Sequence, residues 1–275
     1  MMPPLQKIFV EFSYNNNFGK PYEALECLRR LQEYDEKGLN FHFLMGHQYL
    51  GLGQVNEAII EFKKNLELLA VTDPKSIIDW NYTGLGLAYH QAGLYNDERR
   101  LYKKAKRYFP ESAELVYRQA VLSLSEGNTT ASDRYIEEYQ YYLKKDGVSE
   151  ADIATKLAEM YSEAGLNLNA EDNYRRALSL EPDNIVRIKN LSDFLIDKEV
   201  NINEGVDFAD AGLKTNPEDF DFLHIKGWGK YKQGDQKQAL ELLQKSWDLR
   251  NQYSVYNHTA FLHLEEVKKA VTNYR

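Results

Sequence analysis

The sequence predicts an all-α protein, an α-α superhelix of antiparallel helix pairs, and three periodic features support this fold class. Places expected for a small residue in the second helix of each pair recur at gaps of 34, 40, 34, 38, 35 and 34 residues: Ala24, Ala58, Glu98, Ser132, Ala170, Gly205 and Ala239. The equivalent places in the first helix recur at nearly the same gaps: Phe12, Gly46, Gly86, Ala120, Ala158, Ser192 and Gly227. A glycine also recurs between the two helices: Gly19, Gly53, Gly93, Gly127, Gly165 and Gly234. Series that share one period indicate a repeated unit whose copies stack on each other.

The most regular helix pair lies within residues 151–184. Apolar residues at helical spacing mark its two buried faces: Leu157, Ala158 and Tyr161 in the first helix, and Ala170, Tyr174 and Ala177 in the second. Gly165 should end the first helix in the left-handed conformation that glycine adopts easily. Pro182 should end the second helix, because the residue before a proline avoids the helical conformation. One pair cannot cover its own apolar faces, so it needs copies on both sides.

The third, fifth and seventh copies carry the pattern most completely. The matching residues of the third copy are Tyr82, Leu85, Gly86, Tyr89, Gly93, Tyr102, Ala105 and Pro110. Those of the fifth copy are Leu157, Ala158, Tyr161, Gly165, Ala170, Tyr174, Ala177 and Pro182. Those of the seventh copy are Gly227, Gly234, Ala239, Leu243 and Trp247. With its period of 34 residues, this pattern resembles the tetratricopeptide repeat (TPR) family. The resemblance implies a single TPR solenoid over residues 1–275, with a capping helix after seven copies. The copies are expected at 5–38, 39–72, 79–112, 113–146, 151–184, 185–219 and 220–253, and the capping helix at 254–275.

The first and sixth copies depart most from the pattern. In the first copy Phe12 holds a small-residue place and Asn15, Asn16 and Asn17 replace the tyrosine region. Terminal repeats are expected to be atypical, because they face water on one side. The sixth copy has an extra residue in its turn and glycines at positions 205 and 212, where alanine is usual. Glycine costs a helix about 0.5–1 kcal/mol relative to alanine, so this copy is a candidate soft point.

Two insertions separate copies. Residues 73–78 interrupt the helices with a proline, and Ile77 and Ile78 are expected to pack against the neighbouring pairs. Residues 147–150 form the second insertion, and Ser149 is expected to cap the helix that follows, because a serine hydroxyl can accept a hydrogen bond from a free amide of the first turn.

The composition argues against several classes of protein. The formal net charge of −8 and the pI near 5.4 argue against binding to nucleic acid or to an anionic membrane surface. One cysteine, Cys27, cannot form an intramolecular disulfide and is expected to be buried. No apolar run approaches the roughly 18 residues that span a membrane, and the first residues do not resemble a signal peptide. A cytoplasmic location is therefore favoured, although the doubled methionine at the start would also suit a fragment of a longer protein.

No motif of an enzyme, a metal site or a cofactor site is found. Gly84 and Gly86 fall inside a predicted helix with no preceding strand, so they do not form a nucleotide-binding loop. The pairs His42 and His47, and His258 and His263, are each five residues apart, and this spacing does not place two metal ligands on one helical face. We therefore expect a non-enzymatic protein without cofactor or metal.

The resemblance implies a concave groove lined by the first helices. The matching places in the N-terminal half are Phe9, Asn16, Phe43, His47, Leu50, Trp80, Thr83, Leu87, His90, Tyr117, Val121 and Leu124. Those in the C-terminal half are more acidic: Asp152, Thr155, Glu159, Ser162, Lys189, Asp193, Asp221, His224, Trp228 and Tyr231. Some of the aromatic side chains, Phe43 and Tyr117 among them, could equally pack between helices. Trp80 and Trp228 are the preferred anchors, because tryptophan is enriched at binding hot spots.

These features predict a scaffold for protein–protein interaction that binds a peptide or protein segment in the groove. TPR domains that hold the C-terminal tails of chaperones use paired cations, but the matching places here hold residues such as Phe43, His47, Thr83 and Leu87. Chaperone-tail binding is therefore disfavoured. Two alternatives stay open: an accessory domain at the C-terminal end of a longer enzyme, and a homo-oligomer formed through the degenerate first copy.

Overall fold

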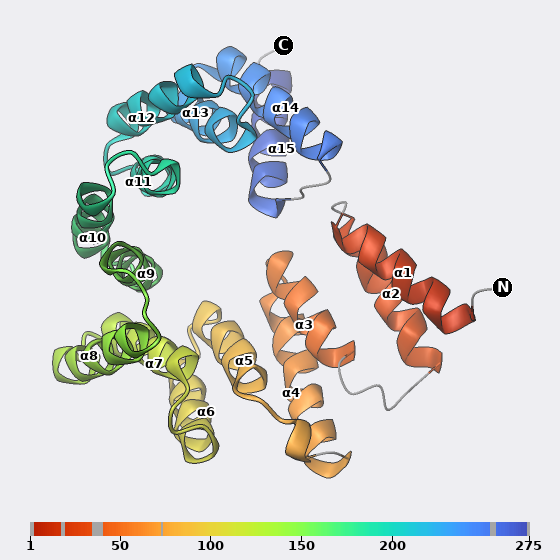
Figure 1. Cartoon of the computed structure of the whole chain (residues 1–275). Helices are drawn as coiled ribbons and strands as arrows, with labels where there is room; N and C mark the ends of the chain where they lie inside the picture. Colours follow the sequence, from red (N-terminus) through yellow and green to blue (C-terminus); the bar gives the residue numbers. More distant parts are fainter. Residues whose placement is uncertain (1–2, 18–19, 35–40, 73, 254–256, 274–275) are drawn as a thin grey trace. The chain divides into compact units, whose positions relative to one another are not determined.

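The computed structural model of the protein describes residues 3–17, 20–34, 41–72, 74–253 and 257–273 (Figure 1). Within these ranges the chain forms fifteen α-helices, one short 3₁₀ helix and no strand, so the all-α prediction is confirmed. The helices are α1 (Pro4–Asn17), α2 (Pro21–Tyr34), α3 (Phe41–Gly51), α4 (Val55–Thr72), η1 (Pro74–Ser76), α5 (Asp79–Gln91), α6 (Tyr95–Tyr108), α7 (Ala113–Ser125), α8 (Thr129–Lys145), α9 (Glu150–Glu163), α10 (Asn167–Leu180), α11 (Ile185–Asp197), α12 (Ile202–Thr215), α13 (Phe220–Lys232), α14 (Gln236–Gln252) and α15 (His258–Asn273).

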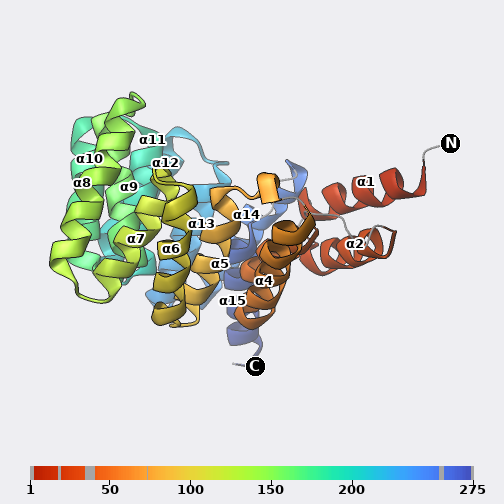
Figure 2. The same cartoon turned by 90° about the horizontal axis from the view of Figure 1, so that it is seen from below.

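The helices pack in consecutive pairs within two compact units, Met1–Tyr142 and Leu143–Arg275. Figure 2 shows the first pair, α1 beside α2. Within the N-terminal unit the first helices α3, α5 and α7 contact one another in turn, and within the C-terminal unit α11, α13 and α15 do the same. A single solenoid over residues 1–275 stays a prediction.

Small residues stand where helices of a pair cross. Ala24, Ala58, Ala170 and Ala239 in the second helices are all fully buried. In the first helices a β-carbon on Gly46 would lie 2.7 Å from the ring of Phe62 on the partner helix α4. Larger side chains at these places would hold the backbones apart, which explains why the sequence period is most visible there.

The turn glycines end the first helix of a pair in the left-handed conformation, as predicted for Gly165. Its φ is 77°, and the amide of the next residue, Leu166, donates back to the carbonyl of Tyr161 at 2.8 Å. Positive φ is also found at the other described turn glycines: Gly53, Gly93, Gly127 and Gly234. Gly19 lies outside the described residues. In the sixth pair Glu199 takes this conformation instead, with φ 54°, which costs a residue with a side chain about 1–2 kcal/mol.

The predictions for the insertion at residues 147–150 are confirmed, and those for the insertion at residues 73–78 are confirmed only in part. Ser149 caps α9 by accepting a hydrogen bond from the Asp152 amide at 3.0 Å, so this prediction is confirmed. Ile77 packs against a core cluster of the N-terminal unit that contains Tyr82 and Tyr102. The expectation that Ile78 also packs is wrong, because its side chain is about half exposed where the chain turns into α5.

The glycines of the sixth copy serve close packing. A β-carbon on Gly205 would lie 2.6 Å from Ile196 of α11, and one on Gly212 would overlap the ring of Phe222 on α13. Helix α12 therefore needs glycine at these two places, because its neighbours approach too closely for a β-carbon. These glycines lower its helix propensity.

The final helix covers the last pair of the C-terminal unit. Leu264 and Val267 on α15 are completely buried and pack in one cluster with Ile225 and Trp228 of α13 and Leu243 of α14. Residues 254–256 and 274–275 of the predicted capping helix lie outside the described residues.

Candidate functional site

A pocket of about 250 Å³ lies along the first helices α3, α5 and α7 of the N-terminal unit. Its lining residues are His47, Trp80, Thr83, Gly84, Leu87, Glu114 and Arg118, and we call it the groove pocket. Four of them, His47, Trp80, Thr83 and Leu87, belong to the groove residues predicted from the sequence. The pocket therefore brings together predicted residues from two helices, α3 and α5.

Trp80 is the large apolar side chain of the groove pocket that is exposed to water. It is the second residue of α5, and 61% of its surface is accessible. The start of this helix is fixed by Asn81, whose side-chain oxygen accepts a hydrogen bond from the Ile78 amide at 2.8 Å. The amide group of Asn81 also donates to Asn65 of α4 at 2.9 Å, and both asparagines are buried. An exposed indole is thus held on an anchored helix turn, which lowers the entropy that it would lose on binding.

His47 also lines the groove pocket and packs against two phenylalanine rings. Its ring centroid lies 4.5 Å from that of Phe43 and 5.0 Å from that of Phe62, both edge-on. Burial lowers the pKa of His47, so the imidazole is neutral at neutral pH. A neutral imidazole offers one hydrogen-bond donor and one acceptor, which suits the polar atoms of a peptide backbone. Phe43 therefore contributes by positioning His47.

The sequence reasoning did not single out Glu114 and Arg118, which close the pocket from α7. Arg118 Nε donates to Glu114 Oε1 at 2.8 Å, and the guanidinium lies 4.9 Å from the centroid of the Tyr117 ring. The four-residue spacing of Glu114 and Arg118 on one helical face was the signal that could have found them.

Several predicted groove residues lie outside the groove pocket. Tyr117 and Val121 are buried between helices, and the Tyr117 ring packs edge-on against Tyr139 of α8. Phe9 and Asn16 are exposed on α1, where the Asn16 side-chain oxygen accepts a hydrogen bond from Gln48 of α3 at 2.6 Å.

His90, another predicted groove residue, links three helices instead. Its Nδ1 lies 3.0 Å from Oε2 of Glu98 on α6, and its Nε2 lies 3.4 Å from the hydroxyl of Ser125 on α7. Glu98 holds a place usually taken by alanine and is only 1% exposed. Burial raises the pKa of Glu98, and the hydrogen bond from His90 opposes this shift.

The order serine, histidine, carboxylate is also that of a nucleophilic triad, but the surroundings of Ser125 do not suit one. Such a site needs amide groups free to stabilise an oxyanion. The amides of Glu126 and Gly127, which follow Ser125, donate to the carbonyls of Leu122 and Leu124 at the end of α7. The contacts of His90 with Glu98 and Ser125 therefore hold α5, α6 and α7 together.

The C-terminal unit has its own pocket, of about 420 Å³, on α11, α13 and the start of α15. Asp193, Asp197, Asp221, His224 and His263 line it, and we call it the acidic pocket. Asp221 is paired with two cations, Arg250 at 2.6 Å and Lys189 at 3.0 Å, and Asp197 pairs with Lys198 at 2.8 Å.

Asp193 has no cationic partner within 4 Å among the described residues. The pKa of Asp193 is raised to about 6, first by desolvation among the surrounding helices and then by the charges of Asp197 and Asp221. Its side chain is exposed to water, and it is therefore accessible to a ligand.

His224 and His263 form a pair at the edge of the acidic pocket. His224 Nε2 lies 3.0 Å from His263 Nδ1, and the two rings stack with centroids 5.1 Å apart. Burial lowers the pKa of both imidazoles, and His263 and Arg250 lower that of His224 further. His263 comes from the final helix, 39 positions after His224, so no local spacing in the sequence could have indicated the pair.

Trp228 and Glu159 occupy different environments. The indole of Trp228 is only 6% exposed and stacks on the His263 ring at a centroid distance of 3.6 Å. Glu159 is exposed to water on one side of α9, and partial desolvation by its neighbours and the charge of Glu163 raise its pKa. Neither residue lines the acidic pocket.

Among the described residues, no group of three or more histidine, cysteine or acidic side chains is placed to bind a metal ion. None of the helices in the described ranges is long and apolar enough to cross a bilayer.

The helix pairs match those of solved TPR structures. A TPR protein from Thermus thermophilus aligns with a TM-score of 0.51 and 20% sequence identity, over 70% of this chain and 98% of that one. A TPR protein from Parabacteroides merdae aligns with a TM-score of 0.49 and 13% identity, over 96% and 98% of the two chains. No family model and no curated protein matches the sequence. The chain therefore has a TPR-type helical repeat fold, as its sequence pattern predicts.

Proposed function

We propose that this protein is a non-enzymatic scaffold that binds a peptide or protein segment along its first helices. The observation that carries this proposal is Trp80, an exposed indole on a fixed helix turn beside the groove pocket. Large aromatic side chains at the centre of a concave surface supply much of the affinity of protein interfaces. Leu87 and His47, which line the same pocket, supply an apolar and a polar contact.

A partner with an apolar side chain fits the groove pocket best. The pocket volume of about 250 Å³ can receive one large side chain, and the Glu114–Arg118 pair offers charged groups at its edge. In the C-terminal unit, Asp193 favours a basic or polar segment, because it is an accessible carboxylate without a cation of its own among the described residues.

The probes are peptides selected on the full-length chain from a random phage-displayed library. We expect Trp80→Ala to weaken their binding by about fivefold or more, because a hot-spot tryptophan contributes over about 1 kcal/mol of binding free energy. Fluorescence anisotropy with the selected peptides measures the change. Tyr22→Ala is the matched control, because Tyr22 is equally exposed but lies on α2 outside the pocket. Equal affinities of the wild type and the Trp80 variant for every selected peptide would refute the groove-pocket proposal. Trp228→Ala is unsuitable as a test, because it would also remove packing against α15.

Binding of a lysine-rich peptide to the acidic pocket should strengthen as the pH rises from about 5.5 to about 7.5. The pKa of Asp193 near 6 means that this carboxylate becomes ionised over that range. Asp197 and Asp221 also face the site, together with Lys189, Arg250 and the neutral pair of His224 and His263. We expect Asp193→Asn to flatten the pH profile in isothermal titration calorimetry. An unchanged profile in this variant would exclude Asp193 as the responsible group.

A further inference from the structure

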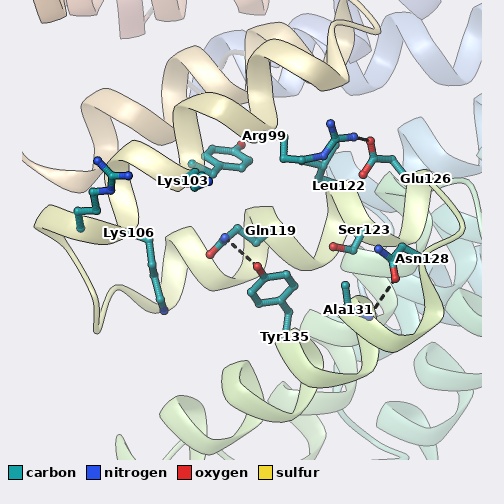
Figure 3. Close-up of a pocket in the computed structure, with 12 residues that line it drawn as sticks. Arg99, Lys103, Lys106, Gln119, Leu122, Ser123, Glu126, Asn128, Ala131 and Tyr135 are labelled. Carbon is teal, nitrogen blue, oxygen red and sulfur yellow. Dashed lines mark hydrogen bonds and ion pairs between the residues drawn. The ribbon is translucent and has the colours of Figure 1, made fainter.

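A third pocket lies in the N-terminal unit, where α6, α7 and the start of α8 line it (Figure 3). Its volume is about 540 Å³, and we call it the basic pocket. Helix α7 contributes to both this pocket and the groove pocket, through different residues. Gln119, Leu122 and Ser123 line the basic pocket, whereas Glu114 and Arg118 line the groove pocket.

One wall of the basic pocket is a stripe of cations on α6. Arg99, Lys103, Lys106 and Arg107 recur at spacings that place them on one side of the helix. A cation near the end of a helix can be explained by the helix dipole, which accounts for Lys106 and Arg107. It does not account for Arg99 and Lys103, which lie in the first half and the middle of α6.

Two of these cations are already paired and two are not. Arg99 forms an ion pair with Glu126, and Lys106 pairs with Glu138 at 2.7 Å. These two pairs tie α6 to α7 and α8. Lys103 and Arg107 are exposed, and neither has an acidic partner within 4 Å in the part of the chain that the structure describes. The pocket therefore has positive charge available for an anionic group.

The opposite wall offers a buried hydrogen-bond acceptor. Gln119 Nε2 donates to the hydroxyl of Tyr135 on α8 at 3.0 Å, as the dashed line in Figure 3 marks. Gln119 Oε1 is buried and has no hydrogen-bond partner among the described residues. A buried acceptor without a donor costs free energy, and a ligand with an N–H group would remove that cost. The floor between the two walls includes the apolar side chains of Leu122 and Ala131.

We infer that the basic pocket binds an acidic peptide segment of a partner protein. A glutamate or aspartate side chain would pair with Lys103 and Arg107, a backbone N–H would donate to Gln119 Oε1, and an apolar neighbour would contact Leu122. A peptide supplies all three groups. A nucleic acid backbone supplies the negative charge without an N–H donor for Gln119 Oε1.

The test uses the full-length chain and a short fluorescein-labelled peptide of alternating glutamate and leucine, followed by fluorescence anisotropy. We expect the double variant Lys103→Glu/Arg107→Glu to weaken binding by about tenfold or more, because hydrogen bonds to charged groups are among the stronger ones. Gln119→Leu should weaken it by about threefold or more, since it removes the buried acceptor while leaving both cations in place. Both cations are exposed, so their replacement should leave the fold intact, which circular dichroism can verify.

Arg100→Glu/Lys104→Glu is the matched control. It changes the charge of the same helix by the same amount, but neither residue lines the pocket. We expect this control to change the affinity by less than about twofold at physiological salt, because these exposed charges make no direct contact in the pocket and are screened by the salt. Trp80→Ala should also leave the affinity unchanged, which separates this proposal from the one for the groove pocket.

Three results would overturn the inference. One is no binding of the acidic peptide by the wild-type chain. Another is an equal loss of affinity in the two double variants, which would indicate general charge attraction. The third is tighter binding of a single-stranded thymidine oligonucleotide than of the peptide, lost in the Lys103/Arg107 variant, which would assign the pocket to nucleic acid.

Discussion

Replacing Gly86 with alanine is expected to destabilise the N-terminal unit by about 1–3 kcal/mol, the usual cost of overpacking a core. A β-carbon on Gly86 of α5 would overlap the ring and the hydroxyl of Tyr102 on α6. Tyr102 cannot move aside easily, because it is only 1% exposed and packs in one cluster with Tyr82 and Leu115. Alanine normally stabilises a helix by about 1 kcal/mol relative to glycine, so a net loss would identify the close approach as the cause.

Urea unfolding followed by circular dichroism measures this change, and two further variants make the cause specific. Gly51→Ala is the control: a β-carbon at this exposed end of α3 meets no atom within 4 Å, so this variant should be neutral or slightly stabilised. In a background with Tyr102→Leu, which is itself destabilised, Gly86→Ala should cost less than it does in the wild type, because the shorter side chain leaves room. The explanation fails if the cost of Gly86→Ala is the same in both backgrounds.

The features of the fold that could be predicted are those that every copy repeats. Residues such as Ala170 and Gly165 are set by local geometry, a helix crossing and a left-handed turn, and so they recur with the period of the sequence. Glu98 stands where the other copies mostly have a small residue. Its carboxylate can be buried there because His90, from another helix, forms a hydrogen bond with it. That compensation depends on tertiary contact, which no local pattern in the sequence reveals.

The candidate sites, too, could be predicted from the sequence only where they do not depend on tertiary contacts. Trp80 and His47 could be predicted to share a surface, because both stand on the inner face of a first helix. Trp228 holds an equivalent place, but the final helix covers it, and the sequence did not indicate how closely that helix would pack. The basic pocket was missed for another reason: the net charge of the chain conceals the local stripe of cations on α6, although their helical spacing can be read from the sequence.

Acidification from about pH 7 to about pH 5 is expected to destabilise the C-terminal unit by about 2–4 kcal/mol. The cause is the pair of His224 and His263, whose pKa values are both lowered in the folded state, chiefly by burial. The folded protein therefore binds fewer protons than the unfolded chain does. The stabilising contribution is complete above the usual histidine pKa near 6.5 and is lost as the pH falls toward the lowered folded values.

The neighbouring charges do not reverse this direction. Arg250 acts on His224 and Lys232 acts on His263 in the same sense as burial, whereas Asp197 partly opposes the shift of His263. Asp193 has a raised pKa, so its contribution to stability increases on acidification and offsets part of the loss that the histidine pair causes.

Urea unfolding at a series of pH values measures the effect of the histidine pair. Tryptophan fluorescence is recorded in a Trp80→Phe background, so that the signal comes from Trp228 and Trp247 of this unit. The double variant His224→Gln/His263→Gln keeps polar side chains of similar size but cannot be protonated in this range, so its stability should depend much less on pH between about 5 and 7. The quantity to compare is the slope of the free energy of unfolding against pH, since a repacked variant can have a lower stability at every pH. If the slope of the double variant equals that of the wild type, another group must be responsible for the loss of stability in acid.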